Sequence, residues 1–211
     1  KGVLGRYEGI EPGALLQPQL TTVKRLIYGR EIDVMLVSVG VNDLRFGAMA
    51  GHCVKHTDCP SVIFPGTNAT LARIMPRYLD DLVDRFDRLA AALEGLVDPS
   101  RVYLTEYFDS TTNDAKKVCS PLMATIMGTF DEAEANWARE SLLLPLNNTI
   151  RLAARAHRFK VISGSEAWFQ GHGYCATDSW VVQLAGWFVG QLNKEGSLRA
   201  SVKGDEEQPR F

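Results

Sequence analysis

The segment IDVMLVSVGVND, residues 32–43, decides the fold of this chain. From Val34 to Val39 it is apolar except for Ser38, with almost no alternation. Such a continuous run is typical of a parallel strand that is buried on both faces. Gly40-Val41-Asn42-Asp43 follows at once and has the composition of a turn that ends a strand. We therefore predict a strand over residues 33–40 and a tight turn at its carboxyl end.

The flanking sequence alternates helical and strand patterns. The expected helices are 19–28, 71–93, 131–157 with a bend near Pro145, and 179–192; the other expected strands are 101–107 and 159–163. The stretches 2–18, 41–70, 109–128 and 164–177 are rich in turn formers and are predicted to be loops. This order predicts an α/β fold with a parallel sheet. Its functional residues should lie where the strands end, at 40–44, 107–113 and 164–173.

The composition excludes several classes of protein. The 211 residues include 23 Lys or Arg and 25 Asp or Glu, a formal net charge of −2, so no nucleic acid is expected as a partner. Hydrophobic residues make up 45% and charged residues 23%, which is ordinary globular usage and argues against a disordered chain. Because no apolar run reaches the ~18 residues of a membrane helix, we do not expect an integral membrane protein.

The four cysteines allow three complete disulfide pairings. We favour Cys53 with Cys59, which would staple a short loop, and this leaves Cys119 with Cys175 as a link between distant loops. Disulfides, together with glycosylation sequons at Asn68 and Asn147, are compatible with a secreted or extracytoplasmic protein.

A metal site is the competing interpretation of the first cysteine pair. His52, Cys53, His56 and Cys59 are all zinc-ligand types and lie within eight positions. Their spacing fits no standard finger or ribbon, however, so we expect neither a metal nor another cofactor.

Gly40-Val41-Asn42-Asp43 resembles the Gly-x-Asn-Asp block of the SGNH, or GDSL, hydrolases, which are esterases and lipases. Residues 17–20, 171–175 and 196–198 resemble further parts of that family. The resemblance implies a three-layer, flavodoxin-like α/β domain over residues 1–198, followed by a polar tail at 199–211. It also implies carboxylic-ester hydrolysis, with a small-molecule or lipid ester as substrate.

The resemblance gives the turn after the strand a chemical role. The Asn42 carboxamide would donate a hydrogen bond to the oxyanion that develops during ester cleavage. Gly40 would let the backbone bend, and Asp43 would hold the turn by bonding loop amides. Elsewhere, His172 and Trp168 are candidate substrate contacts, although packing within a loop explains both more simply. Asp109, Asp114 and Asp178 could serve as catalytic carboxylates, but all three lie in loops, where Asx turns explain them more simply.

Two catalytic groups of the resembled family have no counterpart in this sequence. No Gly-Asp-Ser occurs, and Arg199-Ala200-Ser201 stands where the family would place His-Pro-Asn. Because arginine stays protonated, it cannot act as the base. The nucleophile and the base are therefore not identified, and the sheet lacks its first strand. We expect another segment or a second chain to supply that strand beside residues 33–40, which would otherwise form an exposed edge.

Two functions remain open at this point. One is an SGNH-type ester hydrolase, of which this chain shows the oxyanion arm. The other is a non-catalytic relative or fragment that binds an acylated or glycan ligand, or a partner chain, at the same strand ends.

Overall fold

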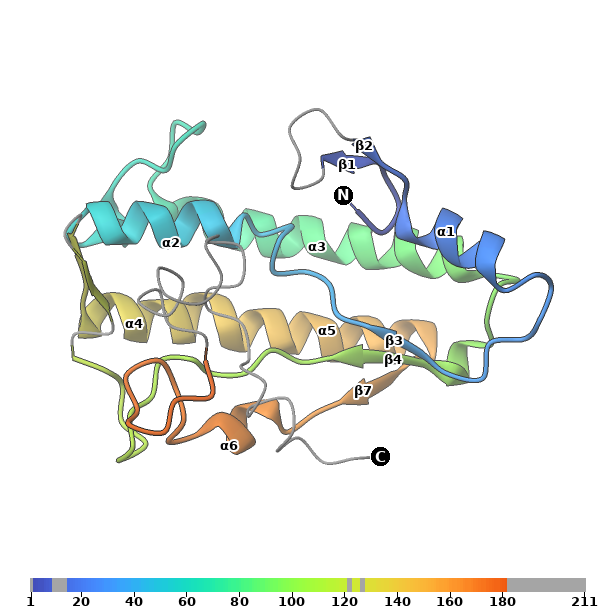
Figure 1. Cartoon of the computed structure of the whole chain (residues 1–211). Helices are drawn as coiled ribbons and strands as arrows, with labels where there is room; N and C mark the ends of the chain where they lie inside the picture. The colour runs from blue at the N-terminus through green and yellow to red at the C-terminus, as the bar shows by residue number, and fades with distance from the viewer. Residues whose placement is uncertain (1, 9–14, 121–122, 126–127, 182–211) are drawn as a thin grey trace.

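A three-stranded parallel sheet lies to one side of the long helices α3 (Leu71–Leu93) and α5 (Leu144–His157) (Figure 1). The computed structural model describes residues 2–8, 15–120, 123–125 and 128–181. The strands β3 (Met35–Val37), β4 (Val102–Thr105) and β7 (Lys160–Ile162) lie in the order β3-β4-β7. Leu36 pairs with Tyr103, and Leu104 pairs with Val161. The predicted α/β class and parallel sheet are confirmed, although each strand is shorter than its apolar run.

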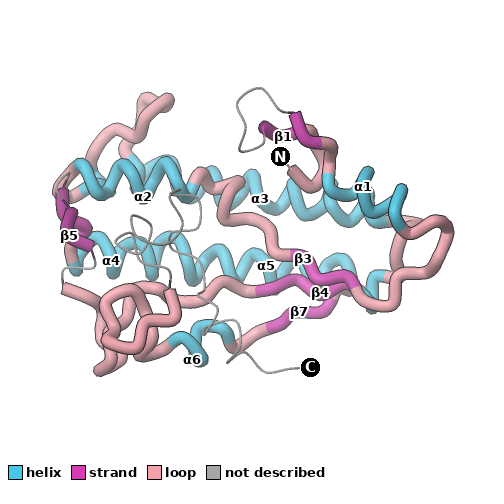
Figure 2. Tube along the Cα trace, in the orientation of Figure 1, coloured by secondary structure: helices cyan, strands magenta, loops and turns pink. Residues whose placement is uncertain are grey.

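Two long helices connect the strands and lie on the same face of the sheet. Helix α3 belongs to the connection from β3 to β4. Helices α4 (Glu132–Ala138) and α5 belong to the connection from β4 to β7 (Figure 2). Because the strand order never reverses, right-handed crossovers place both connections on one side. Helix α3 has the bounds that its apolar stripe predicts, with Pro76 tolerated inside it.

The predicted bend near Pro145 is present as a change of helix type. A π-helical segment, Arg139–Leu143, separates α4 from α5. Pro145 has no N–H group to continue the ordinary hydrogen-bond ladder, so an irregular turn beside it is expected. Asp131 caps α4 through a capping box with Glu134, which fixes where this helical region begins.

Two helices, α2 (Phe46–Lys55) and the short α6 (Ser165–Phe169), contradict the sequence-based expectation. Helix α2 occupies a stretch that was predicted to be loop. Gly47 and Gly51 lower its helix propensity, and so the local pattern indicated turns. Tertiary packing outweighs that preference, because the helix buries Met49, His52 and Cys53. Helix α1 (Gln19–Leu26) agrees with its prediction.

The remaining predicted loops contain short elements. They are β1 (Tyr7–Glu8) and β2 (Leu15–Leu16), η1 (Cys59–Ser61), η2 (Pro99–Arg101), β5 (Met123–Thr125) and β6 (Gly128–Phe130), and α6 (Ser165–Phe169). The predicted helix 179–192 lies outside the described residues beyond position 181, as does the polar tail 199–211. None of the helices in the described part of the chain is long and apolar enough to cross a membrane.

The two faces of the sheet differ in burial. On the face toward α3 and α5, Val102 and Leu104 are 0% and 1% exposed. On the opposite face Leu36 is 65% exposed, and Val34 just before β3 is 57% exposed. Residues 33–40 were expected to be covered on both faces of the sheet. The described elements cover one of these faces and leave the other exposed. Within these elements β3 is also an edge strand, with β4 as its single neighbour.

Candidate active site

The turn after β3 depends on Gly40. Its φ angle is +122°, a conformation that favours glycine, and a Cβ atom there would lie 3.2 Å from Cδ1 of Leu146. The Gly40 carbonyl accepts hydrogen bonds from the amides of Asp43 and Leu44, at 2.9 and 3.2 Å. Arg45 then adopts the left-handed conformation, and α2 begins. The sequence therefore builds a short, closed turn at the carboxyl end of the strand.

Asn42 lies at the outer side of this turn. The residue is exposed, and its carboxamide makes no hydrogen bond to any residue that the structure describes. Its backbone carbonyl is held by the amide of Arg45 at 3.1 Å, so the main chain is fixed while the side-chain donor has no partner among the described residues. A free amide donor on a fixed backbone is what an oxyanion-binding group requires.

Asp43 connects the turn to the helix layer. Its Oδ1 accepts a hydrogen bond from Arg85 of α3 at 2.6 Å. This ion pair ties the turn to α3, and the expected bonds from Asp43 to loop amides stay a prediction. The pair is half-exposed, so it orients the turn more than it stabilises the fold.

Tyr107 lies just beyond β4 and begins the predicted functional segment 107–113, although the sequence assigned it no role. The amide of Val41 donates to its hydroxyl oxygen at 3.4 Å. Burial raises the pKa of the Tyr107 phenol above its usual value, so the hydroxyl stays neutral. The contact joins the ends of β3 and β4, the two neighbouring strands at this edge.

Asn147 of α5 fixes the backbone of Tyr107 on both sides. Its Oδ1 accepts from the Tyr107 amide and its Nδ2 donates to the Tyr107 carbonyl, both at 2.8 Å. The Asn147 side chain is buried, so this sequon does not offer an accessible acceptor, whereas Asn68 is exposed. A polar residue on the buried side of a helical pattern was the signal that could have revealed this role.

The loop after β4 is held by an ion-pair network around Arg139. Asp109 is buried and accepts from the amide and hydroxyl of Thr111, as an Asx-type turn predicts. It also binds Nε of Arg139 at 3.0 Å, and Arg139 Nη2 lies 2.8 Å from Glu166. Glu140 is a third carboxylate partner of the same guanidinium. Asp109 is thus fully engaged in structure and does not serve as a free base.

His172 and Trp168 belong to a separate aromatic cluster. The His172 ring stacks on Trp180 with centroids 4.0 Å apart, and its Nδ1 lies 3.0 Å from the Asp178 carbonyl. The Trp168 ring packs against Gly164. No hydrogen bond or ring contact among the described residues joins either side chain to Asn42. Their role as substrate contacts stays a prediction.

Both favoured disulfides are present, Cys53–Cys59 and Cys119–Cys175. The zinc interpretation thereby loses two of its four ligands, because these sulfur atoms bond to each other rather than to a metal. His52 is buried, and its Nε2 lies 3.3 Å from the Cys59 carbonyl. Burial also lowers the pKa of the His52 ring. The buried carboxylate of Glu134 accepts from the Cys59 amide at 2.9 Å, which locks α4 against the disulfide loop.

No protein-family model matches this chain. No curated protein matches it either. Among solved structures, the fold is similar to that of an extracellular lipase from Streptomyces rimosus, with a TM-score of 0.60 and 18% sequence identity. The match covers 83% of this chain and 65% of the lipase chain. At this identity the likeness shows a lipase-like α/β fold and nothing more specific.

Proposed function

We propose that this chain is part of a secreted carboxylic-ester hydrolase of the SGNH type, acting on a small-molecule or lipid ester. The observation that carries the proposal is the exposed carboxamide of Asn42 at the carboxyl end of β3, which bonds to none of the residues that the structure describes. In a parallel sheet this edge is where ligands bind. The lipase-like fold and the two disulfides support an extracellular ester hydrolase.

In this proposal Asn42 acts as an oxyanion donor. An ester carbonyl oxygen gains negative charge when a nucleophile attacks, and a donor that is already fixed stabilises that charge without reorganising. Gly40 shapes the turn, and Asp43 with Arg85 holds its orientation. Tyr107 supports the same turn from β4 through the Val41 amide.

The nucleophilic serine and the base are not found in this sequence, so a further strand must carry the serine. We propose that it pairs with the free edge of β3 and comes from another segment or a second chain. The sheet order supports this, because β4 is the single neighbour of β3 among the described strands and the other edge of β3 can accept a further strand.

The test is ester turnover together with covalent labelling. The chain is incubated with short p-nitrophenyl esters and with a fluorophosphonate probe, alone and after mixing with the secreted proteins of its source. In the active mixture, Asn42→Ala should lower kcat/KM by about 10²–10³-fold, as loss of one oxyanion donor does elsewhere. The matched control is Asn148→Ala, which removes another exposed asparagine, on α5, and should keep full activity.

A non-catalytic relative is the second candidate, and the missing serine and base favour it. It would bind an acylated or glycan ligand, or a partner chain, at the same strand ends. No turnover and no labelled serine under any of these conditions, with ligand binding that Asn42→Ala weakens, would overturn the hydrolase proposal in favour of this one.

A further inference from the structure

The N-terminal part of the chain combines exposed apolar side chains with exposed cations. Five large apolar side chains between positions 4 and 28 are clearly exposed. They are Leu4 (42%), Leu15 (64%), Leu16 (43%), Leu26 (53%) and Tyr28 (83%). We call this set, with the cations described next, the N-terminal surface. In Figure 1 the hairpin β1–β2 and helix α1, which carry most of it, lie at one corner of the molecule.

Basic side chains lie among these apolar ones. Arg6, Lys24, Arg25 and Arg30 are all exposed, and none of them forms an ion pair with the residues that the structure describes. The first 30 residues contain five Lys or Arg and two Glu, whereas the other 181 contain 18 basic and 23 acidic residues. The positive charge is therefore concentrated where the exposed apolar side chains are.

The surface rests on a fixed support. The amides of Gln19 and Leu20 donate to the carbonyls of Gly2 and Val3, at 2.8 and 3.2 Å, which ties the N-terminal turn to the start of α1. Leu20 packs against the main core, while no residue of α1 is fully buried. Helix α1 therefore lies on the molecule as an amphipathic helix, with Lys24, Arg25 and Leu26 facing solvent.

We propose that the N-terminal surface binds an anionic phospholipid surface. Leucine and tyrosine insert at the boundary of headgroups and acyl chains, while lysine and arginine contact lipid phosphates. Exposed lysine and arginine lie in the same segments as the exposed apolar side chains, which is the combination that binds an anionic lipid surface. The proposal does not depend on ester hydrolysis, but a hydrolase of lipid esters would be brought to its substrate in this way.

The experiment is co-sedimentation of the chain with vesicles of phosphatidylcholine, with and without phosphatidylglycerol. We expect binding to the anionic vesicles only, and weaker binding at higher salt. Lys24→Glu with Arg25→Glu should lower the partition coefficient by at least about 25-fold, from roughly fivefold for each cation lost. Leu15→Ser with Leu16→Ser should lower it as well, because apolar insertion is lost.

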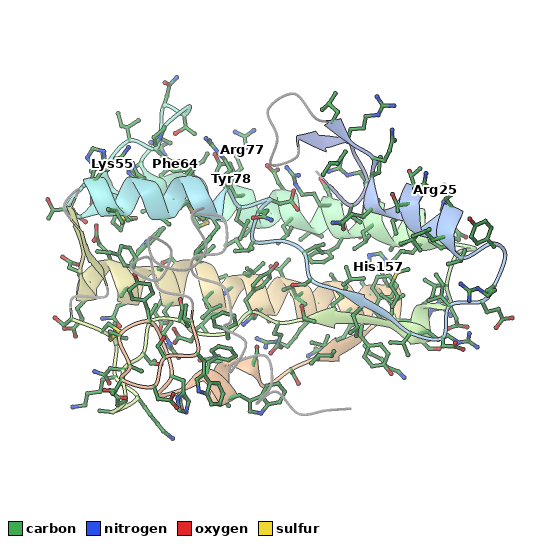
Figure 3. All side chains as sticks on the ribbon, in the orientation of Figure 1. Arg25, Lys55, Phe64, Arg77, Tyr78 and His157 are labelled. Atoms are coloured by element: carbon green, nitrogen blue, oxygen red, sulfur yellow. A yellow bond between two sulfur atoms is a disulfide. The ribbon has the colours of Figure 1, made fainter. Side chains whose placement is uncertain are left out.

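Matched controls separate this surface from general charge and hydrophobicity. Arg73→Glu with Arg77→Glu makes the same charge change on exposed positions of α3, and Figure 3 labels Arg77 well away from Arg25. Val83→Ser with Leu152→Ser removes two other exposed apolar side chains. These variants should bind as the unmodified chain does.

Three results would overturn the proposal. They are equal binding to neutral and anionic vesicles, an equal loss in the control variants, or N-terminal variants that dissociate a dimer without changing vesicle binding. Circular dichroism verifies folding in each case. Because the assay needs no turnover, its outcome is independent of the outcome of the esterase test.

Discussion

The two faces of the parallel sheet differ in how deeply their side chains are buried. One face packs on α3 and α5 and holds fully buried Val102 and Leu104. The other face leaves Leu36 and the preceding Val34 more than half exposed. Both connections between strands run in one direction, so both helices fall on one side. The buried side chains of the first face therefore stabilise the described fold, whereas the described elements leave the second face exposed to solvent.

The largest effect should come from the covered face. We expect Leu104→Ala to lower the free energy of unfolding by ~3 kcal/mol, because it removes a buried side chain and leaves a cavity. Urea denaturation followed by circular dichroism measures this. A loss under about 1 kcal/mol would mean that this face is loosely packed, and the contrast between the faces would then fail.

The packed part of the molecule also contains a buried carboxylate. Its removal should lower the free energy of unfolding by about 2 kcal/mol near neutral pH. Glu134 accepts from the amides of Cys59 and Asp131, at 2.9 and 3.1 Å. Glu134→Gln offers one acceptor oxygen for two donors, so one amide is left unpaired. The matched control is Glu132→Gln, an exposed residue of the same helix, which should change stability little.

The pH dependence sharpens that prediction. Burial raises the pKa of Glu134 above 4.5, so the folded state keeps a proton that the unfolded state has already released. The contribution of Glu134 to stability is therefore greatest below 4.5 and falls as the pH rises through the folded-state pKa. The difference between the unmodified chain and Glu134→Gln should widen as the pH falls from neutrality toward 4.5. A constant difference across this range would contradict the assignment.

At the carboxyl ends of β3 and β4 we expect a smaller change in the free energy of unfolding. Tyr107→Phe removes the acceptor of the Val41 amide and should cost about 1 kcal/mol. Because burial raises the pKa of Tyr107 above 10.0, the unmodified chain should also lose stability as the pH rises above that value, and Tyr107→Phe should lack this component. Denaturant midpoints at neutral and alkaline pH measure both effects.

The sequence predicts the sheet and its main helix well, because residues 33–40 and 71–93 carry their periodicity locally. It also indicates the disulfide pairing through the short spacing of Cys53 and Cys59. It fails for α2, where Gly47 and Gly51 weaken the helical signal and burial against the core decides the conformation. Segments with a local periodicity can therefore be predicted from the sequence, whereas segments whose conformation depends on packing cannot.

The residues of the candidate site also differ in how well the sequence predicts them. Asn42 is predictable because the turn follows directly on an apolar strand. The pairing of Tyr107 with Asn147 joins residues 40 positions apart and exists only after α5 has packed on β4. No local pattern encodes such a contact, except that Asn147 is a polar residue within an apolar stripe.

The smallest effect is the most informative about the uncovered face. Leu36→Ser should change the free energy of unfolding by less than about 0.5 kcal/mol, because an exposed side chain loses few contacts. The measurement is the same urea denaturation that is used for Leu104→Ala, so the two faces are compared directly. If Leu36→Ser costs as much as Leu104→Ala, a layer of this chain outside the described residues covers that face in solution, and a second chain is not needed there. If Leu36→Ser is neutral in the isolated chain but abolishes the ester turnover of the active mixture, a partner in that mixture covers this face of the sheet.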